Sequence, residues 1–290
     1  GITGGVNVSR VSVLMPVYNV KEEYLRESIE SILNQTFTDF EFIILDDCSS
    51  NNVEEIVKSY GDDRIRFYRN SENLGIAKSR NKLMDLARGE YSALMDNDDI
   101  SHPERLKKQV DFLDNNPDIS ILSTAYETFP EKHIIVHPKS VRYLDLFRCC
   151  VITHPSVMYR TGSLREYKLK YKESYICSQD YELWARAIRY LKIANLDSVL
   201  LRYRLNPKSI TQKRQDLALN EDRRIRATML DFLTKDITLQ KQMSEIILGV
   251  HDIKEVEKKS LIQEFFSLRN INKHKVLTIL GIKFKFRREM

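Results

Sequence analysis

The sequence predicts an α/β protein with a mostly parallel central sheet flanked by helices. Over the first hundred residues, short apolar runs typical of buried strands alternate with segments of helical periodicity. This alternation predicts a parallel sheet with right-handed crossovers. The chain has 290 residues, 42% hydrophobic and 30% charged, which is typical of a globular protein with one large or two modest domains.

The expected elements follow one another regularly along the chain. Four strands are expected at Val11–Met15, Phe40–Leu45, Arg64–Tyr68 and Tyr91–Met95. The helical patterns between them cover Glu22–Gln35, Val53–Tyr60 and Ile76–Arg88.

Carboxylates follow two of these strands. The fourth strand runs into Asp96-Asn97-Asp98-Asp99, and the second runs into Asp46 and Asp47. The carboxyl ends of parallel strands share one edge of the sheet, where ligands bind. Asp96 and Asp98 point to the same side of their strand and repel each other unless a hard divalent cation neutralises them. The alternative is two Asp-rich turns, which requires the same coincidence twice.

Missing motifs exclude several other ligand classes. No G-x-G-x-x-G follows the first strand and no G-x-x-x-x-G-K-[ST] occurs, so neither a dinucleotide site nor a P-loop is expected. The four cysteines lack paired C-x-x-C spacing, which argues against zinc and for a reduced setting. No apolar run reaches the roughly 18 residues of a transmembrane helix.

The net charge of +5 is concentrated at the C-terminal end. Residues 273–290 hold six Lys or Arg against one Glu, which by itself equals the whole excess. The remainder is close to neutral, so a nucleic-acid partner is not expected.

Six motifs, taken in order, resemble the family 2 glycosyltransferases of GT-A fold. The first four are Pro16-Val17-Tyr18-Asn19, Asp46-Asp47-Cys48-Ser49, Asn73-x-Gly75-x-x-x-x-Arg80-Asn81 and Asp96-Asn97-Asp98-Asp99. Downstream come Gln179-Asp180-Tyr181-Glu182-Leu183-Trp184-x-Arg186 and Tyr203-Arg204 with Ser209. The resemblance spans roughly 11–211, and the chain looks most like bacterial transferases that extend lipopolysaccharide or capsule oligosaccharides.

The resemblance implies a role for each matched residue. Asp98 would bind the Mn²⁺ or Mg²⁺ that bridges the phosphates of a UDP-sugar, and Asp180 would be the general base in one inverting displacement. Asp47 would accept a hydrogen bond from the uracil N–H. The implied residues of the donor nucleotide site are Pro16, Tyr18, Asn19, Asp47, Arg80, Asp96 and Asn97.

The chemistry of glycosyl transfer needs these two kinds of carboxylate. A cation eases departure of the diphosphate, and a base must take the acceptor's proton as the new bond forms. Asp98 and Asp180 fit these two roles. An alternative for Asp180 is a carboxylate that merely stabilises the start of a helix expected at Gln179–Tyr190.

Three residues are candidates for contacts with the acceptor or the phosphates. They are His154, Trp184 and Arg204, and for the first two we also consider a structural hydrogen bond and core packing, the latter favoured for Trp184. His154 lies in an irregular segment, 127–178, which we expect to carry specificity.

Three departures from the family pattern limit the transfer of roles. Gln179 stands where Glu is common, and Leu205-Asn206 where a His is often found. Cys48 replaces a common Gly, which is tolerable unless the turn needs a positive φ.

The expected domains are an N-terminal arm or cloning remnant (1–10), a catalytic domain (11–211) and a helical extension (212–290). Within the catalytic domain, residues 11–100 would bind nucleotide and residues 101–211 the acceptor. Helical patterns cover 212–233, 239–248 and 256–268. The last segment, 275–288, alternates apolar and basic residues. One interpretation is a contact with an anionic membrane. The other is a terminal strand, or a contact between oligomer subunits, whose basic face is solvated.

The resulting hypothesis is a cytoplasmic enzyme at the inner face of a bacterial membrane. It would transfer a hexose or N-acetylhexosamine from a UDP-sugar to an oligosaccharide acceptor that is lipid-linked. The alternative is a non-catalytic protein of the same fold that binds a nucleotide sugar or glycan.

Overall fold

The computed structural model describes residues 8–205, 214–233, 266–271, 274–279 and 282–287. The chain divides into two compact units, Gly1–Ile225 and Arg226–Met290. Among the described residues, no helix combines the length and the apolar character that crossing a membrane requires.

The first hundred residues form the predicted parallel sheet. Its strands are β1 (Val11–Val17), β2 (Phe40–Asp46), β3 (Ile65–Arg69) and β4 (Tyr91–Leu94), in the spatial order β3-β2-β1-β4. Every pairing among them is parallel. The connecting helices are α1 (Glu22–Leu33), α2 (Val53–Lys58) and α3 (Ile76–Leu86). These bounds confirm the expected alternation to within a few residues.

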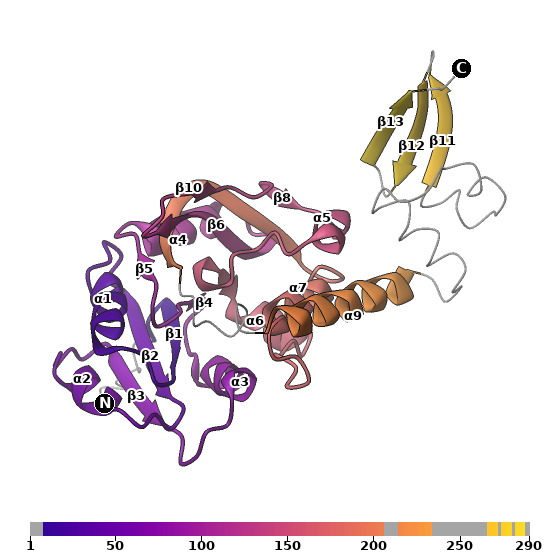
Figure 1. Cartoon of the computed structure of the whole chain (residues 1–290). Coiled ribbons are helices and arrows are strands. Elements are labelled where there is room, and N and C mark those ends of the chain that lie inside the picture. The colour runs from indigo at the N-terminus through magenta and orange to yellow at the C-terminus, as the bar shows by residue number, and fades with distance from the viewer. Residues whose placement is uncertain (1–7, 206–213, 234–265, 272–273, 280–281, 288–290) are drawn as a thin grey trace. The chain divides into compact units, whose positions relative to one another are not determined.

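The direction of winding reverses between β1 and β4. From β1 the chain proceeds outward to β2 and β3, with α1 and α2 on one face of the sheet, and then returns to β4 through α3 on the other face (Figure 1). Such a reversal leaves a crevice at the carboxyl ends of the two central strands, where ligands of α/β proteins bind.

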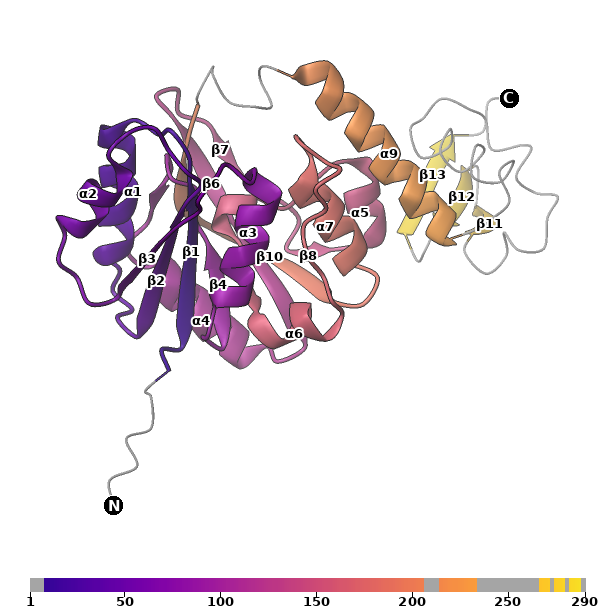
Figure 2. The ribbon, with the colours of Figure 1, turned by 90° about the horizontal axis from the view of Figure 1, so that it is seen from below.

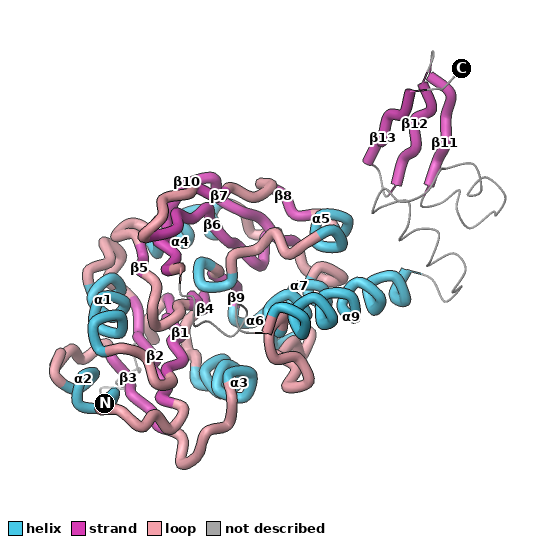
Figure 3. The backbone as a smooth tube through the Cα atoms, viewed as in Figure 1, coloured by secondary structure: helices cyan, strands magenta, loops and turns pink. Residues whose placement is uncertain are grey.

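Beyond β4 the sheet becomes mixed. The order continues β4-β9-β6-β10-β5, with β9 antiparallel to both neighbours, β6 parallel to β10, and β7 and β8 at the margins. The strands are β5 (Ile100–Ser101), β6 (Ile119–Phe129), β7 (Ile134–Ile135), β8 (Ser140–Val141), β9 (Met158–Arg160) and β10 (Lys192–Arg204). The helices are α4 (Arg105–Asn115), α5 (Tyr143–Arg148), η1 (His154–Ser156), α6 (Thr161–Glu166) and α7 (Gln179–Ala187). The segment 127–178, expected to be irregular, therefore contains several short elements (Figure 3).

The core lies between the sheet and its helices. Val13, Phe42 and Ala93 on adjacent strands are fully buried, as are Leu25 and Ile29 of α1. Because helices cover both faces, the strands are continuous apolar runs rather than alternating ones. This packing fixes the strand ends that carry the polar motifs.

The C-terminal extension is only partly helical. Helix α9 (Gln215–Leu233) confirms the first predicted helix, while the patterns at 239–248 and 256–265 lie outside the described residues. The prediction of helix up to residue 268 was wrong at its end, because β11 (Phe266–Ile271), β12 (His274–Ile279) and β13 (Ile282–Arg287) form an antiparallel sheet. The alternation in Lys283-Phe284-Lys285-Phe286 has the period of a strand, which favours the terminal-strand alternative.

Candidate active site

The predicted donor motifs meet at the reversal between β1 and β4. The amide of Asn97, just after β4, donates to the backbone oxygen of Pro16 in β1 at 2.8 Å. Tyr18 follows β1 with its side chain about half exposed. The structure therefore brings together the residues expected to surround the nucleotide.

Asn19 links the loop after β1 to the loop after β2. Its backbone has a φ of 47°, its N–H donates to Ser49 Oγ at 3.0 Å, and its side-chain oxygen accepts from the Ser50 N–H at 2.8 Å. Asn19 thus shapes the edge of the predicted nucleotide site.

Asp47 holds the turn that precedes α3. Its buried carboxylate accepts the N–H of Leu74 and of Gly75, each at 2.9 Å, and the amide of Asn70 at 2.8 Å. Gly75 has a φ of 84°, a conformation that disfavours side chains. The hydrogen bond to uracil stays a prediction, and a carboxylate with about four acceptor positions has capacity for it.

Arg80 of α3 faces the acidic end of β4. Its guanidinium donates to Asp96 Oδ1 at 3.1 Å and lies over the ring of Tyr171, 5.6 Å from its centroid. The Arg80 charge also lowers the pKa of Asp180, which places the two groups near each other. Arg80 thus connects the donor side of the site with the expected base.

Asp180 lies in the first turn of α7, as the helix prediction implied. Burial raises the pKa of its carboxyl, while Arg80 and the N–H groups of Tyr181 and Asp180 itself lower it; the net shift is upward. A carboxylate with a raised pKa is a better proton acceptor, which suits a general base, and that role stays a prediction.

A pocket of about 360 Å³ is lined by four of the predicted residues, Arg80, Asp96, His154 and Asp180. Its lining does not include the other predicted donor and metal residues, which are Pro16, Tyr18, Asn19, Asp47, Asn97 and Asp98. Sequence reasoning assigned no contact to the rest of its lining: Tyr126, His137, Cys150, Ile152, Thr153, Pro155, Ile176, Cys177, Gln179 and Tyr203.

Four buried polar atoms of lining residues have no hydrogen-bond partner. They are Arg80 Nε, Thr153 Oγ1, His154 Nδ1 and Gln179 Oε1. Buried polar atoms are nearly always paired, so a lining that holds several unpaired ones is suited to a polar ligand such as a sugar.

His154 has the structural hydrogen bond considered from the sequence, and its contact with the acceptor or diphosphate stays a prediction. Its Nε2 lies 2.9 Å from the Tyr171 hydroxyl, a structural contact, while its Nδ1 lies 3.9 Å from Asp96 Oδ1. Burial, with Arg80 and Arg105 nearby, moves the pKa of His154 well below its usual value, so the ring is neutral at pH 7. Tyr171, which contacts both His154 and Arg80, was considered from the sequence only as a ring that could stack on a sugar.

Two of the three candidate acceptor or phosphate contacts have other partners. Trp184 is fully buried and does not line the pocket, in agreement with the core packing favoured from the sequence. Arg204 pairs with Glu27, and its Nε donates to the backbone oxygen of Asp98 at 2.7 Å. Arg204 therefore supports the acidic loop, and its contact with an acceptor or phosphate stays a prediction.

The acidic loop contains a buried carboxylate that is only partly hydrogen-bonded. Asp99 is buried, and its Oδ1 accepts the Arg204 N–H at 2.8 Å while Oδ2 has no partner. Burial, together with Asp96 and Asp98, raises the pKa of Asp99 well above its usual value. Part of the charge is offset by Arg105 of α4, which is buried, donates to the Leu94 oxygen at 2.7 Å and has a pKa lowered by burial to about 9.

The residues present fit a divalent cation that shares its ligands with a substrate. Within the described ranges no three His, Cys, Asp or Glu side chains cluster closely enough to hold a metal by themselves. Mg²⁺ and Mn²⁺ commonly bind through one or two carboxylates plus phosphate oxygens. Asp98, in the same loop as the carboxylates of Asp96 and Asp99, matches that pattern.

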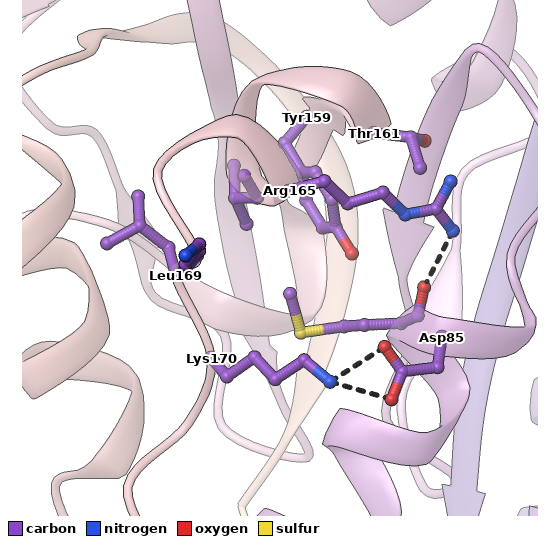
Figure 4. A pocket seen from close by; sticks show the side chains of 9 residues that line it. Asp85, Tyr159, Thr161, Arg165, Leu169 and Lys170 are labelled. Atoms are coloured by element: carbon purple, nitrogen blue, oxygen red, sulfur yellow. Dashed lines mark hydrogen bonds and ion pairs between the residues drawn. The ribbon is translucent and has the colours of Figure 1, made fainter.

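A second pocket lies away from these groups. It has a volume of about 170 Å³ and lies near α3, β9 and α6 (Figure 4). Lys170 closes one side by pairing with Asp85 at 2.7 Å, and Arg165 donates to the Met84 oxygen at 3.1 Å. None of the predicted site residues lines it, so the chemistry is assigned to the larger pocket.

Comparison with known proteins identifies the family. Residues 12–188, more than half of the chain, match the sequence profile described as Glycosyl transferase family 2. The chain belongs to this family. An uncharacterised glycosyltransferase of Methanocaldococcus jannaschii is 41% identical to this glycosyltransferase over 215 residues, which cover 70% of this chain and 73% of that protein.

Further relatives include a transferase whose name states both its donor and its acceptor. WfgD of Escherichia coli, named UDP-Glc:alpha-D-GlcNAc-diphosphoundecaprenol beta-1,3-glucosyltransferase, is 30% identical over 209 residues, 70% of this chain and 80% of WfgD. The crystal structure of Staphylococcus aureus TarS with UDP-GlcNAc has a TM-score of 0.67 at 22% identity and covers 88% of this glycosyltransferase and 77% of that chain. The expected GT-A type of fold is thereby confirmed.

Proposed function

We propose that this glycosyltransferase moves a sugar from a UDP-sugar to a hydroxyl group of a glycan acceptor, with inversion at the anomeric carbon. The main supporting observation is that Asp180 and Asp96 line the same pocket, with Arg80 near both. The expected base thus lies in the same pocket as one carboxylate of the donor side, although more than eighty residues separate the two in the sequence.

In the proposed reaction, Asp180 accepts the proton of the acceptor hydroxyl. The hydroxyl oxygen forms a bond to the anomeric carbon as the bond from that carbon to the diphosphate breaks, and UDP leaves with the electron pair. A divalent cation held by Asp98 would supply charge neutralisation for the leaving diphosphate. Asp47 and Tyr18 bind and orient the uracil ring of the donor. His154, Thr153 and Gln179 offer polar atoms to the hydroxyl groups of the sugar.

The finer assignments have support from relatives. The UDP and UDP-GlcNAc complexes of TarS support a UDP-sugar donor. A mannosyltransferase of Pyrobaculum calidifontis in complex with GDP-Man and Mn²⁺, with a TM-score of 0.55, supports the metal. The name of WfgD supports a lipid-linked acceptor in surface polysaccharide synthesis, and with it a place at the inner face of a bacterial membrane.

Thermal shifts test the donor site directly. UDP, UDP-glucose and UDP-N-acetylhexosamines are added to wild type and to Asp98→Asn, with and without Mn²⁺. A ligand that binds only the folded state stabilises it by about 2.7 kcal/mol at a hundredfold excess over Kd. We expect a shift with wild type that needs Mn²⁺ and is strongly reduced in Asp98→Asn. No shift with any uridine nucleotide would contradict the proposal.

Donor hydrolysis tests the base. Slow Mn²⁺-dependent release of UDP from the stabilising donor is compared between wild type and Asp180→Asn. We expect kcat to fall about 10²–10⁴-fold, because general-base catalysis typically contributes that much. The thermal shift with UDP should be retained. Equal rates in the two proteins would instead favour the non-catalytic, nucleotide-sugar-binding alternative.

A further inference from the structure

A buried carboxylate of α9 binds the loop that leads into the catalytic helix. Glu221 is 1% exposed. One of its oxygens accepts the N–H of Ile176 at 2.7 Å, and the other accepts those of Cys177 and Ser178, each at 2.8 Å. Glu221 lies outside the family match, which ends at residue 188.

The neighbouring residue of α9 holds the start of α7. Ser178 occupies the N-cap position of α7, yet its side chain makes no capping bond within that helix. Its hydroxyl donates instead to Asp222 Oδ1 at 2.7 Å. N-cap side chains normally accept from the first-turn N–H groups, so here anchoring by α9 replaces the usual local cap.

This loop contributes directly to the site. Ile176, Cys177, Gln179 and Asp180 all line the larger pocket, and Asp180 comes two residues after the anchored Ser178. The part of α9 up to Ile225 belongs to the same compact unit as α7, and its Glu221 and Asp222 contact the residue at which α7 begins (Figure 2). The position of the expected base therefore depends on a contact from the C-terminal side of the chain.

We infer that Glu221, assisted by Asp222, is a positioning residue that holds the 176–178 loop and the first turn of α7 so that Asp180 faces the acceptor hydroxyl. This inference rests on the proposed function. A carboxylate that accepts several N–H groups forms strong, directional, charge-assisted bonds. Rigid support of this kind maintains the geometry that a general base requires, since small displacements of a reacting group cost large factors in rate.

The test compares Glu221→Gln with Asp216→Asn. A glutamine has a single acceptor oxygen, so its NH₂ group would face one of the three N–H donors. Asp216 is an exposed carboxylate of the same helix, and its change serves as the matched control. We expect Glu221→Gln to lower kcat at least tenfold with KM for the donor within twofold, and Asp216→Asn to alter neither. Equal kcat values in all three proteins would overturn the inference.

Hydrogen exchange separates positioning from general destabilisation. We expect the amides of residues 176–182 to exchange at least tenfold faster in Glu221→Gln, while those of β1 keep their protection. Faster exchange throughout, with kcat and KM changed together, would indicate a purely structural role and overturn the inference. If Glu221→Gln does not fold, Ser178→Ala provides the test, because it removes only the hydrogen bond from Ser178 to Asp222. An unchanged kcat in Ser178→Ala would overturn the inference.

The two proposals fail in distinguishable ways. Absence of both a UDP-dependent thermal shift and donor hydrolysis in wild type would contradict the proposed function. In that case the exchange of residues 176–182 still reports whether Glu221 holds the loop. Normal nucleotide binding and turnover with local exchange unaffected by Glu221→Gln would contradict only the positioning role.

Discussion

At Cys48 the backbone has a φ of 62°, in the left-handed region that side chains rarely adopt. The sulfur lies 3.7 Å from the Ser71 oxygen, a weak contact. The turn therefore does need a positive φ at this residue, which is the condition under which cysteine in place of the family glycine has a cost. A β-carbon in this conformation costs about 1–2 kcal/mol, so the turn after β2 is strained at this residue.

We expect Cys48→Gly to increase the free energy of unfolding by about 1 kcal/mol, since relief of the strain exceeds the entropy that glycine adds to the unfolded chain. Urea denaturation measures it. Cys48→Ala keeps the β-carbon and should give no gain. An equal increase in the free energy of unfolding in both variants would indicate that the thiol, and not the backbone conformation, destabilises the turn.

The raised pKa of Asp180 predicts a pH dependence of turnover. The base acts only when ionised, so kcat should fall as the pH drops through a pKa above the usual aspartate value of 3.8. The charged or ionisable groups that face Asp180 are Arg80, Asp96, Tyr171 and Cys150. The kcat profile of donor hydrolysis measures the acid limb. The residual rate of Asp180→Asn should lack it, and an identical limb there would assign the titration to another group.

At the scale of elements, the start of α3 depends on one glycine. Gly75 has a φ of 84° and donates its N–H to Asp47, and a β-carbon built there would contact nothing within 4 Å. Substitution therefore introduces backbone strain without a steric clash. Gly162 in α6 has equally open surroundings but no positive φ, which makes the two positions a matched pair.

We expect Gly75→Ala to lower the free energy of unfolding by about 1–2 kcal/mol. Gly162→Ala should raise it by about 0.5–1 kcal/mol, because alanine is the better helix residue. Thermal or urea unfolding measures both. Since Asp47 orients the turn before α3, Gly75→Ala should also weaken the UDP-induced thermal shift, whereas Gly162→Ala should not. A stabilised Gly75→Ala would show that the turn relaxes to a negative φ.

At the scale of the whole molecule, the larger pocket and the basic tail (residues 273–290) belong to different compact units. The pocket is built from residues 80–203, in the first unit, while the tail is in the second. The tail holds the whole net charge of +5. Binding to the donor and attraction to an anionic surface are therefore separable properties.

We expect the triple change Lys283→Gln, Lys285→Gln and Arg287→Gln to weaken binding to phosphatidylglycerol vesicles, as measured by co-sedimentation. The free energy of binding should become less favourable by about 1 kcal/mol for each removed charge. Neutral vesicles and high salt serve as controls. The UDP-dependent thermal shift should stay the same. Unchanged sedimentation at low salt would contradict the membrane contact and leave an oligomer contact as the alternative.

The sequence alone determined the architecture of the donor half of this protein. Strand and helix periods are local, and parallel crossovers have one favoured hand, so the order of apolar runs predicted four parallel strands with connecting helices and the strand ends at Asp47 and Asp96. It also predicted a helix beginning near Asp180. These features depend on near neighbours in the chain and on general rules of winding. The spatial order β3-β2-β1-β4 came from the structure.

Tertiary structure alone decided how distant residues combine in the site. Arg105 looks like an ordinary charged helix residue, and only packing shows that it is buried behind the acidic loop. Tyr171 and Glu221 acquire their roles through hydrogen bonds to His154 and to the 176–178 loop, across 17 and more than 40 positions. Such pairings leave no periodic trace in the sequence, because they depend on how separate elements pack against one another.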